Sequence, residues 1–212
     1  YTAFKAGETV TPIGILPLLL SPFIGKFLSD IDQRWLVTFS FLMFGITFFW
    51  LSGMNPQVPI NHIILIRFVQ GLGLAFFFIP LINIALSDIE YKDISSSSGI
   101  YHFIRLTLGG GFGTSIFVTL WQRREIYHRS VLVENLTPFN SSFERAIEVA
   151  ENLGFKDGQT LAFVERTLQQ QSYLMAVNDC FWLSGWIYFL LIPLIWFSKP
   201  IKNKEKLVLA AE

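Results

Sequence analysis

The sequence predicts an all-α integral membrane protein with five membrane-spanning helices. The chain has 212 residues, of which 52% are hydrophobic and only 15% charged, whereas soluble proteins carry about 25% charged residues. The charges are absent from long stretches, and about 20 apolar residues suffice to cross the ~30 Å hydrocarbon core of a bilayer. These stretches are Thr9–Gly25, Trp35–Ile66, Phe68–Ser87, Leu106–Gln122 and Cys180–Ser198.

The charge-free stretches define five expected helices once Asn55-Pro56 is taken as a turn within the second stretch. Five spans put the two ends of the chain on opposite sides of the membrane. A soluble protein with buried core helices is the alternative, but buried soluble helices rarely come five at a time in a chain of this length. The chain starts with Tyr1 and enters a span almost at once, so we expect a C-terminal fragment of a larger membrane protein. The expected helices are Ala3–Leu28, Trp35–Leu51, Ile60–Ser87, Ser98–Trp121 and Ser172–Ser198.

Composition also argues against several classes of function. The 16 basic and 16 acidic residues balance, whereas a nucleic-acid-binding protein needs surplus positive charge to release counterions. One cysteine excludes a disulfide framework and any multi-cysteine metal site. No hydrolase, metalloprotease or phosphate-loop motif occurs. We therefore expect no enzyme, no catalytic residue, no metal and no bound cofactor.

Lysines and arginines give a weak signal for orientation. Lys26, Arg34, Lys92 and the tail lysines lie on one side of the expected spans. The basic residues of the other side lie in one loop of about 50 residues, and long loops count little in the positive-inside rule. The first side, including residues 199–212 as a tail, is therefore expected in the cytoplasm.

The first and second expected helices differ in character. Ala3–Leu28 contains Pro12, Pro17 and Pro22, which invite bends because proline lacks the backbone donor. Near its start, Lys5 and Glu8 are three residues apart and form a candidate ion pair. Trp35–Leu51 is apolar on all sides, as is the last helix, so both are expected to face lipid on the outside of the bundle.

The third expected helix carries the sharpest functional signal. Arg67 lies about one third of the way into it, with Gln70 one turn later on the same face and Asn83 deeper. A charge inside a membrane is costly and usually faces protein or water, so these three residues are candidates for lining a substrate cavity. The alternative is that Arg67 extends its side chain to the lipid headgroups.

The fourth expected helix contains the glycine-rich segment LGGGFGTS. Gly109 and Gly113 form a small-xxx-small pair, which allows close contact between helices. Arg105 precedes them by one turn and is a candidate functional residue. A purely structural contact with lipid headgroups or a neighbouring helix is an equally consistent interpretation.

Residues 121–171 form an expected extramembrane loop with a small helical hairpin. Ser141 or Ser142 is expected to cap a first amphipathic helix that Gly154 ends. Asp157 or Gly158 starts a second, with Leu161, Val164 and Leu168 on one stripe. The hairpin closes on itself or on the bilayer, or it docks a partner.

Several stretches resemble one family. They are GILPLLLSPFIGKFLSDIDQRWLVTFSF, RFVQGLGLAFFFIPL, HFIRLTLGGGFGTSIFVTLWQRRE and NDCFWLSGWIYFLLIPLIWFSKP, together with the loop segment VENLTPFN. In this order they resemble the EmrB/QacA-type multidrug proton antiporters, which are fourteen-span members of the major facilitator superfamily, and they are most similar to the EmrB branch.

The resemblance implies where the helices belong. Residues 1–120 would hold four helices of the C-terminal six-helix bundle, 121–171 a periplasmic loop, 172–198 the last span and 199–212 a cytoplasmic tail. The segment Gly25–Arg34 corresponds to the superfamily's cytoplasmic loop motif, in which Gly25 and Arg34 match. Ser29, Asp30 and Asp32 depart from that motif.

The resemblance also implies a function. The family exports hydrophobic or amphipathic drugs from the bacterial inner membrane by alternating access, driven by the proton gradient. Helix Ile60–Ser87, with Arg67, Gln70 and Asn83, would line the cavity. The resemblance also implies two protein partners, a periplasmic adaptor and an outer-membrane channel. The segment Ser141–Gln171 would be the surface that faces the adaptor. A permease with a narrower substrate and a membrane scaffold without transport activity are the alternatives. The implied bundle-interface and gating residues are Gly25, Arg34, Arg105, Gly109 and Gly113.

Overall fold

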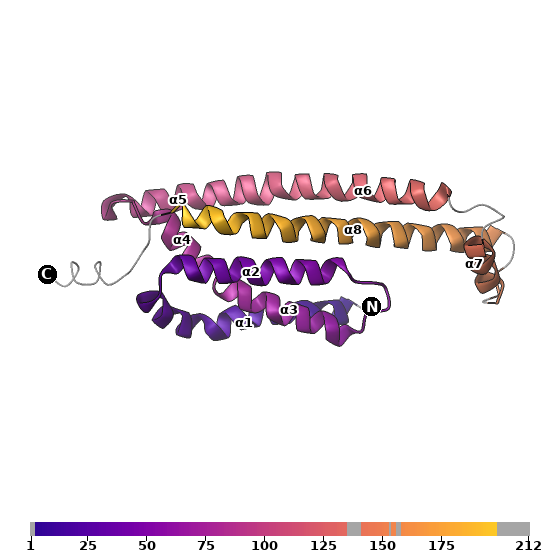
Figure 1. Cartoon of the computed structure of the whole chain (residues 1–212), viewed down its shortest axis with the longest axis horizontal. Helices are drawn as coiled ribbons and strands as arrows, with labels where there is room; N and C mark the ends of the chain where they lie inside the picture. Colours follow the sequence, from indigo (N-terminus) through magenta and orange to yellow (C-terminus); the bar gives the residue numbers. More distant parts are fainter. Residues whose placement is uncertain (1–2, 135–140, 153, 156–157, 199–212) are drawn as a thin grey trace. The chain divides into compact units, whose positions relative to one another are not determined.

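The computed structural model confirms the all-α membrane class. It describes residues 3–134, 141–152, 154–155 and 158–198, and these contain helices and turns but no strand. Five helical stretches are long and apolar enough to cross a membrane (Figure 1). They are Gly7–Ile24, Gln33–Ser52, Ile60–Leu86, Ile94–Glu134 and Gly158–Trp196.

The helices follow the expected order, with two departures from plain α-helix. A 3₁₀ turn, η1, and a π-helical segment, η2, lie on either side of α5. The elements are α1 (Ala3–Asp30), α2 (Gln33–Ser52), α3 (Ile60–Ala75), α4 (Phe78–Leu86), η1 (Tyr91–Asp93), α5 (Ile94–Ile104), η2 (Arg105–Gly113), α6 (Thr114–Glu134), α7 (Ser141–Asn152) and α8 (Gly158–Trp196).

The turn between α1 and α2 is shorter than the loop expected at Gly25–Arg34. Helix α1 continues to Asp30, and only Ile31 and Asp32 are non-helical. Asp32 then caps α2, because its Oδ1 accepts a hydrogen bond from the backbone nitrogen of Arg34 at 3.1 Å. Three residues of this segment depart from the superfamily motif. Ser29 and Asp30 lie at the end of α1, and Asp32 caps α2.

The third span is broken where a single helix was expected. Helix α3 ends at Ala75 and α4 begins at Phe78, with the Phe77 nitrogen bonded to the Leu74 carbonyl in a tight turn. Pro80 explains the break, since it cannot donate to the carbonyl of Phe76 and its ring would collide with that carbonyl.

The fourth span is longer than expected and changes its helix type. It begins at Ile94 rather than Ser98, and α6 runs past Trp121 to Glu134. Between α5 and α6, the π-helical segment contains Gly109, Gly110 and Gly111, which bring no side chains to hold the α-helical register. The extension is consistent with the absence of Gly and Pro between Thr114 and Glu134.

The extramembrane hairpin is present only in part. Helix α7 matches the first expected helix, and Gly154 follows it with a left-handed φ of 87°. The second expected helix is not separate, because α8 runs without interruption from Gly158 to Trp196. No Gly or Pro lies between Gly158 and Gly185 to end it. Residues 135–140 and the expected tail, 199–212, lie outside the described residues.

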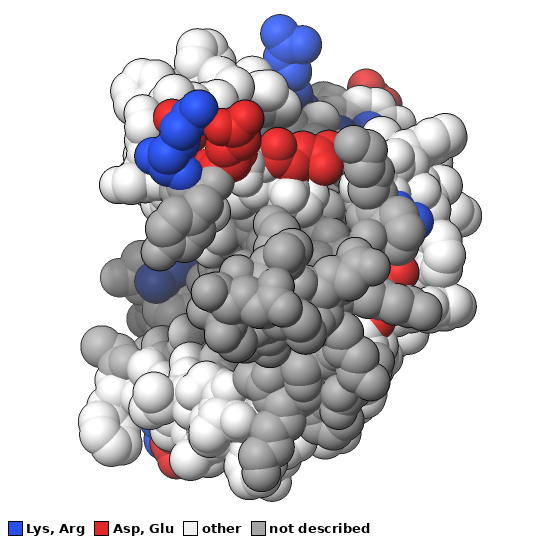
Figure 2. Space-filling model, turned by 90° about the vertical axis from the view of Figure 1, so that its left-hand side faces the viewer, with Lys and Arg blue, Asp and Glu red and all other residues white. Residues whose placement is uncertain are grey.

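The chain forms two compact units, which we describe separately. The first comprises residues 1–110 and 181–212, and the second comprises Gly111–Cys180. Helix α8 contributes its second part to the first unit and its first part to the other. On the face shown in Figure 2, most of the described surface is uncharged.

Helix α2 packs against protein on one side, so the expectation that it faces lipid is limited to its other side. Half of α2 is buried. Its Val37, Phe41 and Phe44 pack against residues of α3, α4 and α8, including Leu74, Leu81 and Tyr188. One side of α2 therefore packs against other helices of the protein. The other side stays exposed as a single helical stripe of large apolar residues, which suits lipid: Trp35, Phe39, Leu42, Ile46 and Trp50.

Glycines set the closest helix contacts in this unit. A Cβ on Gly71 would lie 2.8 Å from the Pro12 carbonyl oxygen, so α3 and α1 meet backbone to backbone. A Cβ on Gly73 would lie 3.0 Å from the Met43 Cβ of α2. By contrast, Gly14 has nothing within 4 Å of an added Cβ.

Candidate functional site

Arg67 and Gln70 form a direct pair within α3. The Arg67 guanidinium donates to the Gln70 Oε1 at 2.8 Å. Arg67 is half-buried, Gln70 is 8% exposed, and the Arg67 Nε is buried without an acceptor among the described residues. The two side chains thus share one helix face, as their spacing predicts, and the intramembrane charge is held by an amide rather than by a carboxylate.

Asn83 is not joined to this pair. It lies half-buried in α4, beyond the break at Phe76 and Phe77. No contact of Asn83 with Arg67 or Gln70 is recorded in the described part of the chain. A cavity formed by all three residues therefore stays a prediction.

The expected interface residues of the fourth span are exposed. Arg105 and Gly113 lie at the two ends of η2, and Gly109 has nothing within 4 Å of an added Cβ. The Arg105 guanidinium lies over the Phe78 ring, 5.0 Å from its centroid, which is a cation–π distance. Packing of these glycines against another helix is therefore not seen within the described residues.

The remaining expected residues lie at the ends of α1 and α2. Gly25 is in α1, but its surroundings lie outside the description. Arg34 is half-buried at the start of α2, and its Nε has no acceptor among the described residues. Lys5 and Glu8 are both exposed near the start of α1, and their pairing stays a prediction.

The second unit contains an ionic cluster that sequence reasoning missed. The Asp179 Oδ2 of α8 accepts from the Arg124 Nε at 2.7 Å and lies 2.6 Å from the His128 Nε2, both on α6. Arg124 and His128 are four residues apart, so they share one face of α6, and this spacing was the only hint of a cluster in the sequence. Asp179 lies more than fifty residues away from both, so the sequence did not identify it as their partner.

A second ion pair joins the same two helices. Arg129 of α6 contacts Glu165 of α8, and both side chains are about half exposed. Arg124 and Arg129, which the sequence analysis placed in the extramembrane loop, thus lie on α6 and contact carboxylates of α8.

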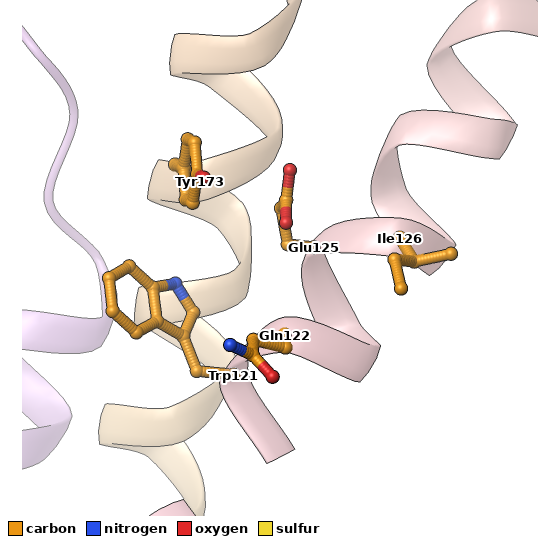
Figure 3. A pocket seen from close by; sticks show the side chains of 5 residues that line it. All are labelled: Trp121, Gln122, Glu125, Ile126 and Tyr173. Atoms are coloured by element: carbon orange, nitrogen blue, oxygen red, sulfur yellow. The ribbon is translucent and has the colours of Figure 1, made fainter. Parts of the chain in front are cut away.

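A pocket of about 340 Å³ lies in the same unit. Trp121, Gln122, Glu125 and Ile126 of α6 line it, together with Tyr173 of α8 (Figure 3). The Trp121 and Tyr173 ring centroids are 5.7 Å apart, and the planes are inclined at 58°. The pocket is large enough for a small organic molecule.

Comparison with known proteins finds close relatives by sequence. The chain is 38% identical over 200 residues to the fatty acid resistance protein FarB of Neisseria gonorrhoeae, and this match covers 94% of the chain and 39% of FarB. It is 37% identical over 201 residues to the multidrug export protein EmrB of Escherichia coli K12, with the same coverage. It is 38% identical over 201 residues to the probable multidrug resistance protein EmrY of Escherichia coli K12. No family model and no solved structure matches the chain.

The match covers nearly all of this chain but only part of each relative. The chain spans about two fifths of the length of the relatives it matches. A weaker match, 21% identical over 190 residues, is to an uncharacterised transporter of the major facilitator type, YhcA of Bacillus subtilis. With five candidate spans and these bacterial relatives, the chain is a multi-pass protein of the bacterial inner membrane. The resemblance to the EmrB branch noted in the sequence is therefore confirmed: over 94% of its length, the chain is similar to EmrB, EmrY and FarB.

Proposed function

We propose that this chain is part of a secondary transporter that exports hydrophobic or amphipathic small molecules. The observation that supports it is the identity of 37–38% to EmrB, EmrY and FarB over 94% of the chain. EmrB is named a multidrug export protein, and FarB a fatty acid resistance protein. The name of FarB specifies fatty acids, which carry long apolar chains.

Export is driven by proton inflow, and the transporter works by alternating access. In such a cycle, helices change their neighbours while polar groups inside the membrane stay satisfied. The pairing of Arg67 with Gln70 within α3 supports this mechanism, because the charge keeps its partner whichever helix lies opposite. We assign both residues to the wall of the transport cavity, with Asn83 further along the same span. Arg34, Arg105, Gly25, Gly109 and Gly113 belong to the gating surfaces of the bundle.

A permease for a narrower set of substrates is the second candidate. The match to FarB favours it, because the name of FarB specifies one chemical class. A fatty acid has a single carboxylate on an apolar chain, and a half-buried arginine such as Arg67 suits that headgroup. Growth of cells that express the full-length protein is measured against a panel of drugs and of fatty acids. Resistance to unrelated drugs favours the multidrug exporter, and resistance to fatty acids alone favours the narrower permease.

The length of helices α6 and α8 supports a partner outside the membrane. Helices α6 and α8 contain 21 and 39 residues, and the rise of about 1.5 Å per residue makes α8 far longer than the bilayer core. A periplasmic adaptor that continues to an outer-membrane channel would contact α7 and the first part of α8. Crosslinking from cysteines placed in α7 tests this contact.

The test of transport uses the full-length protein that contains this chain. Cells lacking their own exporters express it, and efflux of a preloaded hydrophobic dye is followed by fluorescence. We expect rapid efflux that stops when an ionophore collapses the proton gradient. Arg67→Ala should slow efflux at equal expression, and Arg123→Ala at an exposed position of α6 is the matched control. Efflux that continues without a proton gradient contradicts the coupling, and equal efflux by Arg67→Ala contradicts the cavity role.

A further inference from the structure

One pocket of the second unit contains a carboxylate that makes no ion pair with a described residue. Glu125 lines the pocket on α6. Two other carboxylates near α6, those of Asp179 and Glu165, are neutralised by Arg124 with His128 and by Arg129. Within the part of the chain that the structure describes, Glu125 makes no ion pair. The Glu125 side chain is only half-exposed. A positive charge beside it would therefore be attracted more strongly than in bulk water, because the effective dielectric constant is lower there.

Two aromatic rings stand next to this carboxylate. Trp121 and Glu125 are four residues apart and share one face of α6, while Tyr173 comes from α8. Figure 3 shows the Trp121 and Tyr173 rings on one side of the pocket and the Glu125 carboxylate on the other. Inclined aromatic rings beside a carboxylate are the arrangement that recognises organic ammonium groups, since both the ring faces and the carboxylate attract a cation.

The Trp121 indole adds a buried polar group to the pocket. Its Nε1 is buried and has no acceptor among the described residues. The edge of the ring that carries this nitrogen is turned toward the other labelled side chains in Figure 3. Buried donors without acceptors are rare in folded proteins. The donor is therefore available to an oxygen atom on a bound molecule.

We propose that the pocket lined by Trp121, Glu125 and Tyr173 binds the ammonium group of an amphipathic organic monocation. The rings hold the cation from one side and Glu125 from the other, while the apolar part of Ile126 and the stem of Gln122 extend the lining. This site is distinct from the Arg67–Gln70 pair, which suits anions. Binding here does not require the transport cycle, so it can be measured whether or not the proposed export is correct.

The test is calorimetric titration of the full-length protein in nanodiscs made of phosphatidylglycerol alone, which carries no ammonium headgroup. The probe is benzyltrimethylammonium, and phenylmethanesulfonate is its anionic counterpart. We expect the cation to bind and the sulfonate not to bind. Glu125→Gln and Trp121→Ala should each weaken cation binding roughly tenfold, as expected for losing a partly desolvated charge or cation–π contact.

Further variants separate the site from a general loss of structure. Trp121→Phe keeps a ring and should weaken binding less than Trp121→Ala, and Tyr173→Phe should bind as the wild type does. Glu134→Gln, at the end of α6, and Trp182→Ala, an exposed tryptophan of α8, are matched controls that should leave affinity unchanged. Each variant must elute as the wild type does in size exclusion.

Two results would overturn the proposal. One is equal cation affinity in the wild type and in Glu125→Gln. The other is equal affinity for the cation and the sulfonate, which would leave Trp121 and Tyr173 as membrane-interface anchors only.

A last arm identifies the source of the ammonium group. If phosphatidylethanolamine added to the nanodiscs competes with the probe in the wild type but not in Glu125→Gln, the site takes a lipid headgroup. If it does not compete, the site takes a free cation. Both results support the pocket and differ only in its occupant.

Discussion

Gly71 and Pro12 bring two membrane helices into backbone contact. A Cβ on Gly71 would lie 2.8 Å from the carbonyl oxygen of Pro12, and 3.0 Å from the Cδ1 of Leu16. The backbone carbonyl cannot rotate away as a side chain can. Glycine at position 71 is therefore required for α1 and α3 to approach as they do.

We expect Gly71→Ala to destabilise the protein by about 1–3 kcal/mol, because overpacking forces the two backbones apart. Gly14→Ala is the matched control, since an added Cβ there meets nothing within 4 Å. Unfolding of the full-length protein in detergent, followed by circular dichroism, measures both. If the two alanine variants unfold alike, the close contact does not set stability.

A reciprocal pair of contacts joins α2 and α8. A Cβ on Gly45 would lie 2.9 Å from the Phe189 ring, and a Cβ on Gly185 would lie 3.0 Å from the Phe49 ring. The two rings are themselves stacked, with centroids 5.8 Å apart. We expect Gly45→Ala to lower stability by about 1 kcal/mol, since a ring can shift where a carbonyl cannot.

A double-mutant cycle tests this contact. Phe189→Leu removes the ring that the new Cβ meets, so Gly45→Ala should cost less in the Phe189→Leu background than in the wild type. The same measurement of thermal unfolding serves all four proteins. Strictly additive effects would show that Gly45 and Phe189 do not press on each other.

The hydrogen bond between Arg67 and Gln70 predicts an asymmetry among variants. Gln70→Leu removes the acceptor and leaves a half-buried guanidinium unpaired, so we expect a loss of about 1–3 kcal/mol. The double variant Arg67→Met with Gln70→Leu removes both partners and should recover most of that loss. Denaturation midpoints in detergent check the order. A double variant less stable than Gln70→Leu alone would mean that Arg67 is stabilised chiefly by groups other than Gln70.

The two ionic contacts of the second unit should differ in strength. Asp179 is bound by both Arg124 and His128, and its carboxylate is about one third exposed, whereas Glu165 of the Arg129 pair is about half exposed. Asp179→Asn should lower stability by about 0.5–1 kcal/mol, and Glu165→Gln by less, since exposed pairs contribute little. Urea unfolding at low and at high salt compares them. A larger loss for Glu165→Gln would contradict this ranking.

The sequence predicted the spans well because lipid imposes a simple rule. Charge-free stretches located all five, and the boundaries of α1 and α2 fell within two residues of the expected ones. The same reasoning did not predict the break after Ala75, although Pro80 was visible. Proline in a membrane helix can kink, interrupt or be accommodated, and the neighbouring helices determine which of these occurs.

The sites were harder to predict, because they depend on pairs distant in sequence. The Arg67–Gln70 pair was predictable since both residues lie on one helix face. The partner of Asp179 was not, since it required α6 to extend beyond Trp121. The close contacts of Gly45 and Gly185 were not predicted, because each receives a single ring from a facing helix and no sequence pattern marks it. The small-xxx-small pair Gly109 and Gly113 stays a prediction.

The pairing of Arg67 within its own helix has a consequence for the evolution of the protein. A salt bridge between two helices ties both to each other, and a substitution in one must be matched in the other. An arginine whose acceptor lies three residues away in the same helix imposes no such demand. The helices opposite α3 are therefore free to change their side chains, and thus the molecules they contact, while the buried charge remains satisfied.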